Sequence, residues 1–143
     1  MGSRGRIAVL AALAALALIP IGTGALGVFA GLTFGPGDGS ERTAYFDSEY
    51  RFLNGVWFTL GLVLLWAIRR PGERRSVVLV VLVVILGGAV ARLVHSVVFG
   101  WPPLLFTIAL AVEVTVVPVL TVAFARVFPP AMGKKESDVG TAL

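Results

Sequence analysis

Arginine, histidine and glutamate occur within apolar stretches, and these side chains could bind a ligand or transfer a proton. Arg92 and His95, the single histidine, lie in "GGAVARLVHSVV", and Glu113 lies in "LAVEVTVVP". Gly88, Arg92 and His95 have the spacing i, i+4, i+7, so they share one face of a helix. Because an arginine or aspartate at the centre of a membrane helix costs about 2.5–3.5 kcal/mol on insertion scales, the charged groups need partners.

A short uncharged connection, "GWPP", joins these two stretches and predicts an antiparallel hairpin of helices. At a rise of 1.5 Å per residue, Arg92 lies about 9 Å from the outer end of its helix, which is the end that leads into "GWPP". Glu113 lies at a similar or slightly greater depth in the returning helix. We therefore predict an ion pair between Arg92 and Glu113.

A third group of polar residues opens an earlier apolar run, in "FDSEYRFLNG". Asp47 or Ser48 is expected to cap the helix that starts there. Three interpretations remain open for the whole set: an ion-pair network that fixes helix register, a site that binds a ligand or protons, and a docking surface for a partner. We predict that six side chains converge toward the outer half of the molecule: Glu49, Arg51, Asn54, Arg92, His95 and Glu113.

The elements that position these side chains follow from composition. The chain has 143 residues, of which 57% are hydrophobic and 14% are charged, so we expect lipid to cover its apolar surface. A bilayer core requires about 20 mostly apolar residues per helix. Continuous apolar runs favour helices over the alternating strands of a barrel. The sequence predicts an all-α, single-domain, four-helix membrane bundle with spans at about 7–34, 52–68, 77–98 and 104–128, and a polar tail at 129–143.

Basic residues predict the orientation. They lie before the first run, between the second and third, and after the fourth: Arg4, Arg6, Arg69, Arg70, Arg74, Arg75, Arg126, Lys134 and Lys135. Positive residues stay on the cytoplasmic side, so both termini are expected there, in the bacterial cytoplasmic (inner) membrane. The start, "MGSRGRIAVLAALAALALI", also has the features of a signal peptide. Because the apolar run continues far beyond that length, we expect a retained first helix.

Small residues predict where helices approach one another closely, because helix association in lipid depends on close contact between backbones. The candidate residues are Gly24, Gly27, Gly31, Gly55, Gly61, Gly87 and Gly88. Packing within the bundle is the favoured interpretation, and a docking face for another membrane protein is the alternative.

Several function classes are disfavoured. The chain has no cysteine, so thiol chemistry and thiolate metal sites are excluded. Basic residues flank the apolar runs instead of gathering on one face, which argues against nucleic-acid binding. We expect no catalytic residues, no metal and no cofactor, and hence no enzyme.

Three stretches together, "SEYRFLNGVW", "GGAVARLVH" and "LAVEVTVVP", resemble a family of small four-helix bacterial integral membrane proteins, a domain of unknown function. The resemblance covers roughly residues 45–125. It implies the four-helix fold and suggests that Arg51, Arg92 and Glu113 are signature positions. It brings no established activity.

The expected function is that of a non-enzymatic accessory or stabilising subunit of a larger membrane complex, in a cell-envelope system that transports lipids or other hydrophobic compounds. The expected partners are membrane lipid and other integral membrane subunits. The alternative is a small proton-coupled transporter or ligand binder that uses Arg92 and Glu113.

Overall fold

A computed structural model describes residues 2–33 and 44–130 of the chain. It contains the helices α1 (Ser3–Ala30), α2 (Ala44–Ile68), α3 (Arg75–Phe99) and α4 (Leu104–Val127), with a short 3-10 turn, η1 (Gly31–Thr33), after α1. All four are long and apolar enough to cross a membrane. The predicted all-α architecture of four apolar helices is confirmed. Most of the predicted polar tail, residues 131–143, lies outside the described residues.

Helix α2 begins at Ala44, eight residues before the predicted start of its span at 52. Asp47 therefore lies in the first turn of α2 and Ser48 lies one residue further in, so neither is the N-cap that the sequence suggested. Hydropathy marks only the apolar part of a helix. The polar first turns of α2 are helical because they contact α1, through bonds described below.

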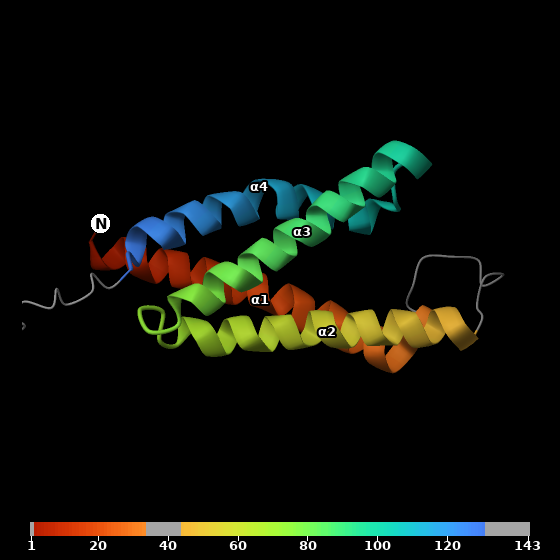
Figure 1. The fold of residues 1–143 in the computed structure, drawn as a ribbon, viewed down its shortest axis with the longest axis horizontal. Helices are drawn as coiled ribbons and strands as arrows, with labels where there is room; N and C mark the ends of the chain where they lie inside the picture. Colours follow the sequence, from red (N-terminus) through yellow and green to blue (C-terminus); the bar gives the residue numbers. More distant parts are fainter. Residues whose placement is uncertain (1, 34–43, 131–143) are drawn as a thin grey trace, which may run out of the picture.

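Consecutive helices run in opposite directions. The start of α1, the connection at residues 69–74 and the end of α4 consequently lie at one end of the bundle, at the left of Figure 1. We call this the basic end, after the arginines that surround it: Arg4, Arg6, Arg69, Arg70, Arg74, Arg75 and Arg126. The opposite end, called the far end, holds η1, the start of α2 and the connection between α3 and α4.

The hydrophobic core occupies the half of the bundle nearest the basic end. Its buried side chains are Val9, Leu13, Leu16, Ala17, Leu64, Ala67, Val78, Val81, Leu82, Ile85, Val117, Leu120, Phe124, Val127 and Phe128. Within each helix they follow the spacing of three and four residues that places side chains on one face. All four helices therefore meet in this half.

Toward the far end the bundle continues as two separate hairpins. In Figure 1, α3 starts beside the end of α2 and diverges obliquely from it, so the far ends of α2 and α3 lie apart. In the described chain the backbones of α2 and α4 do not come within 8 Å of each other at any Cα pair, and neither do those of α1 and α3. Each hairpin must consequently be closed at its far end by contacts of its own.

Candidate functional site

Helices α1 and α2 approach each other at the level of their backbones. A Cβ atom on Gly24 would lie 2.7 Å from the backbone nitrogen of Phe58 and 2.8 Å from the carbonyl oxygen of Asn54. A Cβ atom on Gly61 would lie 2.9 Å from the carbonyl oxygen of Ala17. The Asn54 side chain occupies the space beside Gly27. These glycines are required for packing inside the hairpin.

The glycines predicted to mediate packing thus fall into two groups. Gly24, Gly27, Gly31 and Gly61 face α2 or α1 directly, and Gly55 has only the Val28 side chain near it, at 3.9 Å. The hypothesis that Gly24, Gly27 and Gly31 form a docking face is therefore wrong, because α2 already covers these three glycines. A Cβ atom on Gly87 or Gly88 would meet no atom of residues 2–33 or 44–130 within 4 Å, so these residues leave a glycine surface of α3 uncovered.

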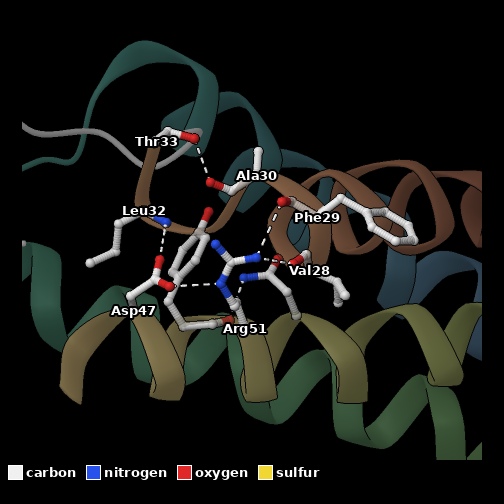
Figure 2. Close-up of polar contacts among 9 residues, drawn as sticks. Val28, Phe29, Ala30, Leu32, Thr33, Asp47 and Arg51 are labelled. Carbon is white, nitrogen blue, oxygen red and sulfur yellow. Dashed lines mark hydrogen bonds and ion pairs between the residues drawn. The ribbon is translucent and has the colours of Figure 1, made fainter. Parts of the chain in front are cut away.

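At the far end, Arg51 of α2 holds the end of α1, as Figure 2 shows. Its Nε donates a hydrogen bond to Asp47 Oδ2 at 2.7 Å, and its Nη1 donates to the carbonyl oxygen of Val28 at 2.6 Å. Asp47 Oδ1 accepts a hydrogen bond from the Leu32 amide at 2.8 Å. The last carbonyls of a helix lack partners within the helix and attract a cation. Asp47 and Arg51 therefore form a clamp on the end of α1.

Gly31 makes this clamp possible. Its φ of +59° is a conformation that residues with a side chain rarely adopt, and it turns the chain out of α1 so that the Leu32 amide faces Asp47. The space that a Cβ atom would need at Gly31 is filled by the side chains of Asp47 and Arg51.

Two further polar side chains of α2 are satisfied along the same hairpin. Asn54 Nδ2 donates a hydrogen bond to the Tyr50 carbonyl at 2.8 Å, within α2. Trp57 Nε1 donates to Thr23 Oγ1 of α1 at 3.1 Å. The polar groups of the α1–α2 hairpin are thus bonded mainly to backbone atoms or to each other.

In the second hairpin, Arg92 of α3 and Glu113 of α4 form the ion pair that the antiparallel arrangement predicts. Arg92 Nε lies 3.7 Å from Glu113 Oε2, which is too far for a hydrogen bond. The Glu113 side chain is 9% exposed and that of Arg92 is 36% exposed. In the part of the chain that the structure describes, Arg92 Nη1 and Glu113 Oε2 are buried without a hydrogen-bond partner.

This pair lies just beyond the core. The core residues of α3 end at Ile85, and those of α4 begin at Val117, one helical turn from Glu113. The Arg92 guanidinium carbon also lies 5.9 Å from the centre of the Phe106 ring. Chemically, the pair offers one unused donor and one unused acceptor, so it can bind a group that both accepts and donates a hydrogen bond.

The six polar side chains expected to converge do not form one cluster. Asn54 and Arg51 belong to the α1–α2 hairpin, while Arg92 and Glu113 belong to the α3–α4 hairpin. Glu49 is exposed, and so is His95. The His95 ring lies 5.3 Å from that of Phe99, one turn further along α3. The prediction used depth alone, which does not tell which helices touch.

Asp47 was missed as a member of the site. Its spacing of four residues from Arg51 is the signal that could have identified the pair, since residues four apart on a helix are neighbours. No group of three metal-ligating side chains occurs within residues 2–33 and 44–130.

The fold and these contacts define a multi-pass membrane protein whose two helical hairpins are each joined by an arginine and a carboxylate. The chain belongs to the family described as Domain of unknown function (DUF4345), which it matches over residues 8–124. The match extends the resemblance from residue 45 back into α1, so the first helix is part of the family's domain. No curated protein and no solved structure matches the chain.

Proposed function

We propose that this chain is a non-enzymatic accessory subunit that stabilises a larger assembly in a membrane. The observation that carries the proposal is the uncovered small-residue face of α3, formed by Gly87, Gly88 and Ala91. All three are exposed, and no atom in the described part of the chain lies within 4 Å of a Cβ atom on either glycine. Small residues let the backbones of two membrane helices approach closely. This face of α3 is suited to a helix of another protein.

The surroundings of this face favour an integral membrane partner. Val84 and Val98 flank the small residues on α3, and both are exposed. An apolar, recessed helix surface is complementary to an apolar helix within the bilayer. We assign the assembly to the transport of lipids or other hydrophobic compounds in a bacterial cell envelope, since such substrates move within the layer that this face contacts.

The accessory role is tested by purifying the tagged native protein in a gentle detergent and quantifying co-purified proteins by mass spectrometry. Gly88→Leu should remove a stoichiometric partner, because the added side chain occupies the space that the partner helix needs. Gly22→Leu is the matched control, since Gly22 is also a helical glycine with nothing within 4 Å. Purification of the wild-type chain without partners, or equal loss in both variants, would refute the proposal.

We further propose that the basic end faces the cytoplasm. Its seven arginines support this orientation, because positive residues are retained on the cytoplasmic side. The chain has no cysteine, so single cysteines can be introduced at Gly72 and at Trp101, which is exposed. In intact cells an impermeant thiol reagent should label the cysteine at 101 and leave the one at 72 unlabelled. The reverse pattern would overturn the orientation.

A second candidate function is a ligand binder or small proton-coupled transporter that uses Arg92 and Glu113. The buried atoms without hydrogen-bond partners, Arg92 Nη1 and Glu113 Oε2, favour this candidate. If Glu113 exchanges protons, infrared difference spectra of the purified protein across a pH series should contain a protonated-carboxyl band that Glu113→Gln removes. A series without such a band would eliminate proton coupling at this residue.

A further inference from the structure

Three helices meet at the basic end around a single residue, Phe128, which follows α4. Arg75, the first residue of α3, donates a hydrogen bond from Nε to the Phe128 carbonyl at 2.7 Å. Arg6, near the start of α1, has its guanidinium carbon 5.2 Å from the centre of the Phe128 ring. Two guanidinium groups from helices distant in sequence therefore contact the same residue, one at its ring and the other at its carbonyl oxygen.

The positive charge at this place is not compensated by the described residues. Glu73 is the one acidic residue described at the basic end, and it is paired with Arg70 at 3.4 Å. Arg74 donates to the Trp66 carbonyl at 2.6 Å and lies 3.7 Å from the Trp66 ring centre. Within residues 2–33 and 44–130, neither Arg6 nor Arg75 has a carboxylate partner, in contrast to Arg51 and Arg92.

The helix dipoles increase this positive potential. The N-termini of α1 and α3 both lie at the basic end, and neither has an acidic residue in its first turn or a side-chain cap. A helix N-terminus carries a partial positive charge and favours a nearby anion. Here the residue near each N-terminus is an arginine, and a positive side chain beside the positive end of a helix dipole is unfavourable. This unfavourable arrangement occurs twice beside Phe128, at α1 and at α3.

We propose that Arg6 and Arg75 bind the phosphate group of an anionic phospholipid at the junction of α1, α3 and α4. Guanidinium groups match the oxygens of a phosphate in both charge and geometry. The junction lies at the end of four helices that are long and apolar enough to cross a membrane, where headgroups would lie if these helices span the bilayer. Ile7, beside Arg6, is 66% exposed and offers an apolar surface to the acyl chains. The bound headgroup would connect three helices and is independent of the proposed accessory role.

The test uses the full chain, purified in a mild detergent, with dioleoylphosphatidylglycerol as the anionic probe and dioleoylphosphatidylcholine as the zwitterionic one. Native mass spectrometry should show retained phosphatidylglycerol adducts, and this lipid should raise the unfolding temperature more than phosphatidylcholine does. The double variant Arg6→Gln/Arg75→Gln should lose this selectivity. The matched control Arg69→Gln/Arg70→Gln removes the same charge at the α2 side of the basic end and should keep it.

Equal loss of selectivity in the control pair would overturn the proposal, because a general attraction to positive charge would then explain binding. If Arg6→Gln/Arg75→Gln does not fold, Arg6→Gln alone decides, since Arg6 is exposed and its described contact is with the Phe128 ring alone. Inorganic phosphate at matched ionic strength distinguishes a lipid from a free anion. Stabilisation by phosphate equal to that by phosphatidylglycerol would refute the lipid as the ligand.

Discussion

The two hairpins use the same pair of residue types, an arginine and a carboxylate, in opposite ways. In α1–α2, Asp47 and Arg51 lie on one helix, and together they bind the backbone of the other. In α3–α4, Arg92 and Glu113 lie on different helices and face each other at 3.7 Å. The first arrangement satisfies its groups with backbone partners, whereas the second leaves buried atoms of both residues without hydrogen bonds.

The difference follows from how closely the backbones approach. Glycines bring α1 and α2 into direct contact, so side chains of α2 reach carbonyl and amide groups at the end of α1. No glycine lies in the contact between α3 and α4, so side chains separate their backbones. Arg92 and Glu113 therefore have each other as partners instead of backbone groups. The backbone contact of α1–α2 gives this hairpin the features of a scaffold, and α3–α4 is the hairpin on which the proposed partner or ligand would act.

The largest effect that we predict is on the scaffold. Gly24→Leu places a side chain against the backbone of Phe58 and Asn54, which cannot move without separating the helices. Overpacking typically costs about 1–3 kcal/mol, and we expect a loss of about 3 kcal/mol or more here. Gly88→Leu should change stability by less than about 1 kcal/mol, since it fills open space and leucine favours a helix. Unfolding in one detergent measures both.

If Gly24→Leu is tolerated as well as Gly88→Leu, the close contact between α1 and α2 does not hold the scaffold together. The two hairpins would then not differ in how strongly close backbone contact stabilises them.

The second prediction concerns the ion pair of α3–α4. Removing one partner of a buried ion pair typically costs about 3–5 kcal/mol, because the other charge is left buried and unpaired. Arg92→Leu leaves Glu113 in that state, and the partial exposure of the pair at Arg92 lowers the expected cost to about 2–3 kcal/mol. Glu113→Leu should cost about 1 kcal/mol, because the longer Arg92 side chain can reach a polar region. The double Leu variant should recover much of the loss. A double-mutant cycle of unfolding free energies gives the interaction directly.

Single effects that simply add would show that Arg92 and Glu113 do not interact energetically. Rescued stability without rescued co-purification would instead show that the pair contributes to partner binding beyond holding the hairpin.

Much of the fold could be predicted from the sequence. A backbone group without a hydrogen bond is costly in lipid, so an apolar run long enough to cross a bilayer must form a helix. The ends of α3 and α4 fall close to the predicted spans. The start of α2 could not be located in this way. Its polar first turns depend on Asp47 and Arg51 contacting α1, which is a tertiary effect that composition does not contain.

The site could be predicted only in part. The ion pair of Arg92 and Glu113 follows from a short connection and equal depth, both of which are visible in the sequence. The separation of Arg51 and Asn54 from this pair depends on α2 and α4 lying diagonally in the bundle. Helix order does not specify such an arrangement, because several packings of four antiparallel helices place these residues at the same depth.

The third prediction addresses the clamp at the end of α1. Arg51→Gln removes the donor to the Val28 carbonyl and the partner of Asp47, and should lower the unfolding temperature by a few degrees. The effect should be smaller than that of Arg92→Leu, since the clamp is partly exposed and the helices remain joined at Gly24. Asp47→Asn should be milder still, because an amide oxygen can accept the bond from Leu32. Hydrogen exchange at residues 28–33 locates the change. An effect of Arg51→Gln as large as that of Arg92→Leu would show that the clamp stabilises the whole hairpin.

The smallest predicted effect concerns the hydrogen bond between Trp57 and Thr23, which crosses the α1–α2 hairpin at 3.1 Å. Thr23→Val keeps the shape of the side chain and removes the acceptor, so Trp57 Nε1 loses its partner. Hydrogen bonds between membrane helices average about 0.6 kcal/mol, and we expect a loss of that order. Thr59→Val is the control, since the Thr59 hydroxyl bonds to the Gly55 carbonyl of its own helix. Unfolding free energy and the tryptophan fluorescence maximum should both change in Thr23→Val and stay constant in Thr59→Val. If Thr23→Val changes neither quantity, close backbone contact alone stabilises this part of the α1–α2 hairpin. The difference from α3–α4 would then be larger, because in α3–α4 polar side chains and not glycines stabilise the contact between the helices.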